Sequence, residues 1–155
     1  MLNQGHDISV LNSLIETTID SVDGYRRSST EATNERFAST FRDWASEREQ
    51  VVTKLRDRVR QLGGEPEHDG SLLAAAHRQF LSLRDKVTGS DDQSVIAEVD
   101  RGESYLDGKW QAALNDDAVS AETKTLIRDC YTSVRSGHEQ WEQLNKSMSS
   151  ATGTL

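Results

Sequence analysis

Apolar residues recur along most of this chain at intervals of three and four, which places them on one face of an α-helix. The strict alternation of apolar and polar residues that is typical of a half-buried strand does not occur. Breaks rich in polar residues and glycine divide the pattern into five predicted helices. They cover about residues 7–29, from 34 to about 62, from 71 to near 89, 92–114, and from 120 to a small polar tail.

The residues that end these segments are typical of helix caps and helix stops. Asp7 is the predicted N-cap of the first helix, and Ser120, with Thr123 in the first turn, is the predicted N-cap of the last. The run Gly63-Gly64-Glu65-Pro66 is predicted to stop the second helix, because glycine favours the turn after a helix and proline cannot continue it.

The lengths of the connections decide how the helices are arranged. Short segments join the first two helices and the last two, so each pair must form an antiparallel hairpin. Between the hairpins, residues 63–91 carry a helix of their own and can cross the whole length of a bundle, which makes the helices over 34–62 and 92–114 parallel. We therefore predict an all-α, ferritin-like four-helix bundle with an additional helix in the long crossover. The domain covers residues 7–149, and 150–155 form a flexible tail.

Composition excludes several classes of partner. The 155 residues include 18 Lys and Arg against 26 Asp and Glu, a formal charge of −8, whereas a protein that binds the phosphate backbone needs clustered basic residues. The sequence has no apolar run long enough to span a membrane and no secretory signal, so we expect a cytoplasmic protein. Cys130 is the single cysteine and is predicted to be a small core residue. Trp44, Trp110 and Trp141 occur at core spacing and are predicted to be packing anchors.

Several strings in the sequence resemble one known family. They are residues 11–26, Leu62 to Pro66, Gly70-Ser71, Ala76-His77-Arg78, Glu98 to Glu103, and Gly137-His138-Glu139. Over roughly residues 8–146 the chain resembles a bacterial family of uncharacterised ferritin-like four-helix-bundle proteins, a domain of unknown function. The resemblance implies the ferritin-like fold, and it raises the question of a di-iron site.

The sequence does not complete the pattern of a di-iron site. Such a site takes a Glu from each of two helices and a Glu-x-x-His motif from each of the other two. Glu47 has Gln50 at the histidine position, and His138 has Arg135 at the glutamate position. The acids of the first helix, Glu16, Asp20 and Asp23, lie on its solvent side. We therefore assign no catalytic residue and no cofactor. Glu47, Glu103 and His138 remain candidate ligands for iron or manganese.

Each of the four long helices has a polar residue within or beside the middle of its apolar stripe. These residues are Thr18, Arg48, Glu103 and His138. We predict that they form a buried polar layer at mid-height in the bundle, in which the Arg48 guanidinium pairs with Glu103 through bidentate hydrogen bonds. The layer has three alternative interpretations. It is a device that fixes helix alignment, or a degenerate or single-metal site of Glu103 and His138 that Glu47 can join after a change of rotamer, or a small-ligand pocket or catalytic acid.

These patterns favour a non-catalytic protein with a stress-related or protein-interaction role. The alternative is a ferritin-like protein that binds iron or manganese for storage or oxidation. A third class, a nucleoid-protecting relative of the starvation ferritins, conflicts with the acidic charge and the lack of a basic tail. We expect a homodimer, because bundles of this shape often associate along a helical face. Nucleic acid and membrane are not expected partners.

Overall fold

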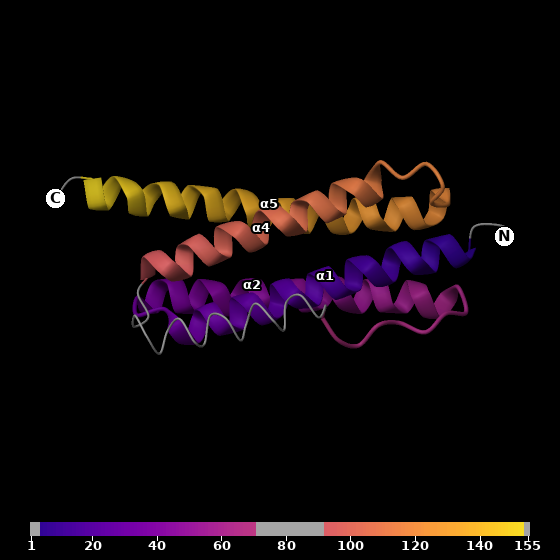
Figure 1. The fold of residues 1–155 in the computed structure, drawn as a ribbon, viewed down its shortest axis with the longest axis horizontal. Helices are drawn as coiled ribbons and strands as arrows, with labels where there is room; N and C mark the ends of the chain where they lie inside the picture. The colour runs from indigo at the N-terminus through magenta and orange to yellow at the C-terminus, as the bar shows by residue number, and fades with distance from the viewer. Residues whose placement is uncertain (1–3, 71–91, 154–155) are drawn as a thin grey trace.

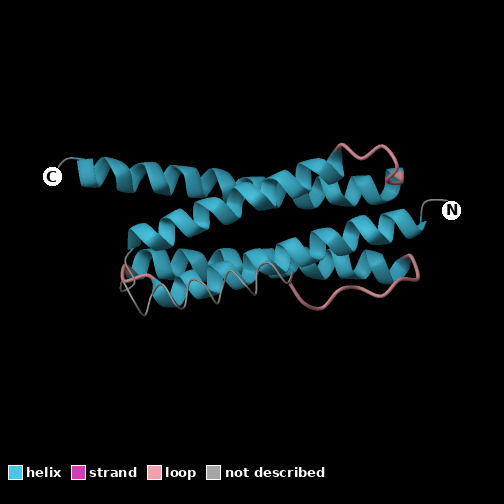
Figure 2. Ribbon diagram, viewed as in Figure 1, coloured by secondary structure: helices cyan, strands magenta, loops and turns pink. Residues whose placement is uncertain are grey.

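The structure is a computed structural model that describes the backbone of residues 4–70 and 92–153 and the side chains of residues 4–70 and 95–147. These parts of the chain form long helices and connecting loops, with no strand among them (Figure 2). The additional helix predicted within residues 71–89 lies outside the described residues. Among the described helices, none is long and apolar enough to cross a membrane.

Four helices form an elongated bundle of two antiparallel hairpins (Figure 1). The first hairpin pairs α1 (Gln4–Glu31) with α2 (Glu35–Gln61), and the second pairs α4 (Asp92–Leu114) with α5 (Ala121–Gly153). Helices α2 and α4 run in the same direction, while α1 packs beside α2 and α4, and α5 packs beside α4 and α2. The predicted all-α four-helix bundle and its parallel second and third long helices are confirmed.

Local sequence explains where the helices begin and end. The Asn34 side chain accepts hydrogen bonds from the backbone N–H groups of Arg36 and Phe37 and so caps α2. At the other end of α2, Gly63 has a φ of 83°, and the N–H groups of Gly63 and Gly64 return to the last turn of the helix. A left-handed backbone conformation at this position favours glycine, so the stop predicted from the sequence is confirmed.

Asp7 is the clearest correction to the predicted helix ends. It is not an N-cap: α1 begins at Gln4, and Asp7 lies buried in its first turn. Its carboxylate accepts hydrogen bonds from the backbone N–H of Ser120, at 2.9 Å, and from the Ser120 hydroxyl. The Ser120 hydroxyl in turn accepts from the N–H of Thr123, which confirms Ser120 as the cap of α5. Asp7 thus supports the start of a different helix.

The C-terminal end also differs in length from the predicted segment. Helix α5 continues to Gly153, so helical structure extends past residue 149 into the segment predicted to be a tail. Cys130 lies in the core, and burial raises the pKa of its thiol.

The hydrophobic core consists of two clusters, one in each half of the bundle. The first lies toward the end that carries the α4–α5 connection and contains Leu11, Ile15, Leu55, Leu106, Trp110, Ile127 and Val134 among others. The second lies toward the α1–α2 connection and is rich in aromatic rings, including Tyr25, Phe37, Phe41, Trp44 and Trp141. All three tryptophans are buried, as expected of packing anchors.

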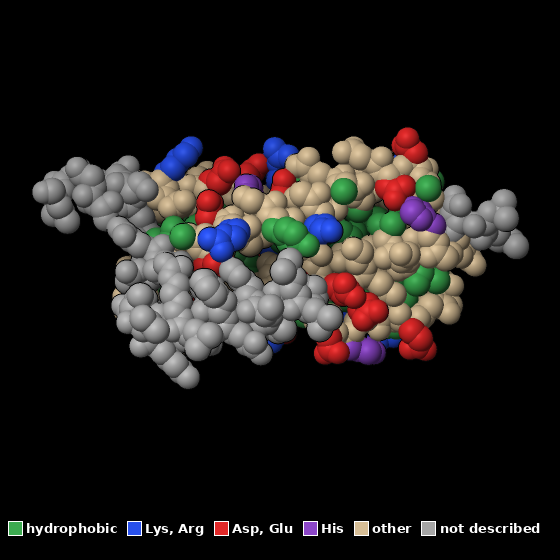
Figure 3. All heavy atoms as spheres, viewed as in Figure 1, with side chains coloured by type: hydrophobic (Ala, Val, Ile, Leu, Met, Phe, Trp, Pro, Cys, Tyr) green, Lys and Arg blue, Asp and Glu red, His purple; other side chains and the backbone are tan. Residues whose placement is uncertain are grey.

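Charged side chains of both signs cover the outside of the bundle. Basic side chains on the face seen in Figure 3 are scattered and form no continuous patch. Several arginines form exposed ion pairs, such as Arg42 with Glu35 at 3.0 Å and Arg135 with Glu139 at 3.1 Å. Exposed pairs of this kind add little to stability, so the fold depends on the interior.

The Asp7–Ser120 contact leads to a pH-dependent prediction. Burial raises the pKa of Asp7. The hydrogen bonds from Ser120 and Thr123 and the charge of Arg58 together lower it by more, so the net pKa lies below its ordinary value of 3.8. A depressed pKa contributes stability above the unfolded-state value, and this stability is lost as the pH falls through the folded-state value. We expect Asp7→Asn to cost about 1 kcal/mol at neutral pH, by analogy with the loss of a helix cap.

Urea unfolding of wild type and Asp7→Asn at several pH values measures this difference. The gap between the two proteins should shrink as the pH falls below about 4, because the wild-type carboxylate is then protonated. A gap that is the same at neutral and acidic pH would show that the Asp7 charge does not support the cap.

Candidate functional site

A band of polar side chains separates the two apolar clusters. Along each helix, the residues of one apolar cluster lie on one side of this band and the residues of the other cluster lie on the opposite side. The band contains Ser21 from α1, Arg48 from α2, Glu103 from α4, and Gly137 and His138 from α5. We call it the central layer, and all four long helices contribute to it.

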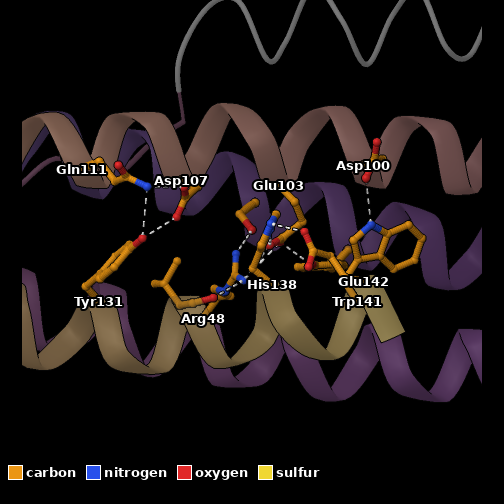
Figure 4. Close-up of polar contacts among 12 residues, drawn as sticks. Arg48, Asp100, Glu103, Asp107, Gln111, Tyr131, His138, Trp141 and Glu142 are labelled. Atoms are coloured by element: carbon orange, nitrogen blue, oxygen red, sulfur yellow. Dashed lines mark hydrogen bonds and ion pairs between the residues drawn. The ribbon is translucent and has the colours of Figure 1, made fainter. Parts of the chain in front are cut away.

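The Arg48 guanidinium lies at the centre of this layer. Arg48 is 3% exposed and Glu103 is also 3% exposed, so both charges are removed from water. The Arg48 Nη2 atom lies 3.1 Å from Glu103 Oε1 and 3.3 Å from Oε2, while Nη1 donates to the Ser21 hydroxyl at 2.8 Å. Nη2 also donates to the backbone carbonyl of Val134 at 3.4 Å (Figure 4).

This pairing differs in one respect from the predicted bidentate geometry. A single guanidinium nitrogen, Nη2, contacts both carboxylate oxygens of Glu103, whereas a fork would use two nitrogens. The reason is that Nη1 is directed to Ser21 on α1. Arg48 therefore connects its own helix to all three of the others, rather than making one strong pair.

Tyr25 contacts both members of the ion pair. From the sequence, we expected this residue only as part of the apolar stripe of its helix. Its hydroxyl donates a hydrogen bond to Glu103 Oε1, and its ring lies beside the Arg48 guanidinium, 5.5 Å from ring centroid to Cζ. Burial, together with the negative charge of Glu103, raises the pKa of Tyr25 well above its usual range. Tyr25 thus remains a neutral donor to the carboxylate at physiological pH.

His138 connects the central layer with the surface. Its Nδ1 lies 3.3 Å from Glu103 Oε2, and its Nε2 lies 3.2 Å from Oε1 of Glu142, an exposed residue one turn later in α5. The His138 side chain is 23% exposed, so it lies at the edge of the layer rather than in its centre. The structure brings His138 and Glu103 together, as Figure 4 shows.

Thr18 is fully buried but bonds to different partners. Its hydroxyl donates to the Leu14 carbonyl at 2.7 Å and accepts from the Trp110 indole N–H at 3.3 Å. These bonds satisfy the indole within the apolar cluster. On α1, it is Ser21, one turn later, that contacts the guanidinium. Sequence reasoning gave Ser21 no role, since short hydroxyl residues are common on the exposed faces of helices.

Gly137 provides the space that the guanidinium occupies. A Cβ atom at this position would lie 2.9 Å from Arg48 Nη2, closer than real Cβ contacts come. Glycine in the interior of a helix costs about 1 kcal/mol relative to alanine, and at Gly137 the space that it leaves is filled by the guanidinium. In the sequence, that unfavourable position was the only signal that a bulky group lies opposite.

The buried polar side-chain atoms of the layer have hydrogen-bond partners. Among the described side chains, no buried nitrogen or oxygen atom lacks a hydrogen-bond partner. This matters because an unpaired buried charge costs several kcal/mol, whereas a pair with its remaining donors and acceptors satisfied can persist in a core.

The candidate metal ligands do not converge. Glu47 is exposed, and so is Gln50, at the position where a di-iron motif would carry histidine. Glu16, Asp20 and Asp23 of α1 are half-buried. Within residues 4–70 and 92–153, no group of three or more His, Cys, Asp or Glu side chains could hold a metal ion.

The two hairpins, with their parallel second and third long helices, define a ferritin-like four-helix bundle. A family model described as domain of unknown function, DUF2383, matches residues 6–116, which is more than half of the chain. The chain belongs to the DUF2383 family. The match ends before α5, the helix that carries Val134, Gly137 and His138. Among curated proteins, none matches the sequence.

Two solved structures have a fold similar to that of this chain. A dodecameric thioferritin, the bacterioferritin-related protein of Bacteroides fragilis, aligns with a TM-score of 0.77 at 14% identity and covers 98% of this chain and 91% of its own. The Dps protein of Vibrio cholerae O1, of a broad superfamily of ferritin-like diiron-carboxylate proteins, aligns with a TM-score of 0.70 at 16% identity, covering 95% and 91%. At these identities the similarity concerns the fold.

The ion pair leads to a prediction about single and double variants. Arg48→Met or Glu103→Leu alone leaves one buried charge without its partner, which should cost about 3–5 kcal/mol of unfolding free energy. The double variant removes both charges, so it should cost clearly less than the sum of the two. Denaturant unfolding of the four proteins measures this coupling; two harmless and additive single substitutions would show that no coupled pair exists.

A second prediction concerns Gly137→Ala, whose effect on the free energy of unfolding should change sign when the Arg48–Glu103 pair is removed. In the wild type, Gly137→Ala places a methyl group against a guanidinium that three helices hold, so it should destabilise by about 1–2 kcal/mol. The Arg48→Met/Glu103→Leu variant has no guanidinium at this point. In that variant, Gly137→Ala should stabilise the protein by up to about 1 kcal/mol, because alanine has a higher helix propensity than glycine.

Gly102→Ala is the matched control, because nothing lies within 4 Å of a Cβ at that α4 position. It should stabilise both backgrounds equally. If Gly137→Ala behaves like Gly102→Ala in the wild type, Gly137 is not required by Arg48.

Proposed function

We propose that this protein is a non-catalytic ferritin-like bundle, in which the buried Arg48–Glu103 pair takes the place of a complete di-iron site. The observation that carries the proposal is the Arg48 guanidinium in the centre of the layer, bonded to Glu103, Ser21 and Val134. Di-iron bundles instead direct several Glu and His side chains inward at this point.

Electrostatics support this proposal. An arginine side chain keeps its positive charge in proteins, so the Arg48 guanidinium repels a metal ion placed near it. A divalent ion 4 Å from it would experience a repulsion of about 8 kcal/mol at an effective dielectric constant near 20. Glu103, the one buried carboxylate in the layer, is already neutralised by Arg48.

The role proposed for the layer is to fix the alignment of the helices. Each hydrogen bond of Arg48 specifies the height of one neighbouring helix, and a slip of one turn would leave a buried charge unpaired. A bundle without a reacting centre acts through its outer surface, so we propose a protein-interaction role for the aligned helices.

The alternative is a bundle that binds iron or manganese. It is favoured only by the contact of Glu103 with His138, two side chains of the types that ligate these metals. A third ligand would have to come from Glu47 by a change of rotamer, and Glu47 is exposed. We therefore keep this function as the outcome that would overturn the proposal.

Metal analysis separates the two functions. Protein purified without chelator or affinity tag should contain iron and manganese at well below one ion per chain and should not accelerate the oxidation of Fe²⁺ in air. A Dps-type ferritin serves as the positive control, and Glu103→Gln as the matched variant. Stoichiometric iron or manganese that is lost in Glu103→Gln would show that the central layer is a metal site.

A further inference from the structure

The surroundings of the Arg48 guanidinium form a cage of oxygen atoms that the other three helices supply. The Ser21 hydroxyl comes from α1, the Glu103 carboxylate from α4 and the Val134 carbonyl from α5. The ring of Tyr25 lies beside the cation and leaves its hydroxyl directed at the carboxylate. Arg48 itself belongs to α2, so all of these contacts with the cation come from helices other than its own.

The cage fits a planar cation with several N–H donors better than it fits a metal ion. The acceptors lie 2.8–3.4 Å from the guanidinium nitrogens, which are hydrogen-bond distances. A divalent ion would need several oxygen ligands at 2.0–2.6 Å, and the cage offers one carboxylate. The aromatic ring adds a surface that attracts a delocalised cation.

Gly137 completes the shape of the cage. Its missing side chain leaves open the space that Arg48 Nη2 fills, so the opening extends to the Val134 carbonyl of the same helix. The cage is thus defined on one side by charge, on another by an aromatic ring, and on a third by the absence of a Cβ atom.

We infer that the central layer is a binding site for a guanidinium-type cation, which the protein fills with its own Arg48 side chain. Shortening that side chain therefore leaves a site that takes a free guanidinium ion. The inference rests on the proposed function, in which Arg48 is the resident cation of the layer. The ligand class is a small planar monocation with N–H donors on more than one side.

The test uses Arg48→Ala and free guanidinium chloride at millimolar concentrations, far below the molar concentrations that unfold proteins. Guanidinium should raise the Tm of Arg48→Ala along a saturable curve, by about 3–5 °C at ten times its Kd. The wild type should not respond, because Arg48 already occupies the cage.

Two ligands and two variants serve as controls. Urea has the shape of guanidinium without the charge, and potassium chloride has the charge and ionic strength without the shape; neither should stabilise Arg48→Ala. Arg42→Ala removes an exposed arginine of the same helix that pairs with Glu35, so it should not respond to guanidinium. Arg48→Ala/Glu103→Gln lacks the carboxylate and should lose the response.

A second measurement applies if Arg48→Ala does not fold without ligand. The variant is then diluted from denaturant into millimolar guanidinium or urea, and recovered helix is measured by circular dichroism. Guanidinium should restore helix and urea should not, because only the cation pairs with Glu103.

The inference is overturned if guanidinium does not raise the Tm of folded Arg48→Ala, or does not restore helix to an Arg48→Ala that fails to fold. It is also overturned if urea or potassium chloride stabilises Arg48→Ala as well as guanidinium does, or if Arg48→Ala/Glu103→Gln still responds. None of these outcomes changes the metal content of the wild type, which alone decides the proposed function. A metal-loaded wild type would overturn the proposed function whatever Arg48→Ala does.

Discussion

The buried contact between Arg48 and Glu103 is the constraint on which the rest of this bundle depends. Two charges that are almost completely removed from water can persist only if each finds a partner and if their remaining donors and acceptors are used. Ser21, Tyr25 and Val134 meet that requirement from two other helices. The apolar clusters on either side stabilise the bundle through burial.

The same constraint explains why the centre of the bundle differs chemically from its two ends. A ferritin-like di-iron centre collects negative side chains around positive ions, and the protein's electrostatics then depend on a bound metal. Here the positive charge is covalently part of α2, so the layer is neutralised as soon as the helices assemble. His138 and Glu142 extend this network to the surface, where exposure weakens each contact.

Much of the fold could be predicted from the sequence, because helix periodicity and connection length depend on local residues. The hairpins, their parallel second and third long helices, the stop of α2 at Gly63 and the cap of α5 at Ser120 follow from such patterns. Arg48 and Glu103 were identifiable because each interrupts an apolar stripe. The partners Ser21, Tyr25 and Gly137 were not, since their roles depend on the rotation and height of neighbouring helices. Asp7 was misassigned for the same reason: its partner is 113 residues away.

The position of Arg48 along the chain also has a consequence for the order of synthesis. The first hairpin is complete at Gln61, but Glu103 lies 55 residues after Arg48 and the Val134 carbonyl 86 residues after it. Until those residues leave the ribosome, the inward face of the nascent hairpin carries a cation without its counter-ion. A charge on an otherwise apolar face opposes self-association, so we expect Arg48 to reduce aggregation of the unfinished hairpin.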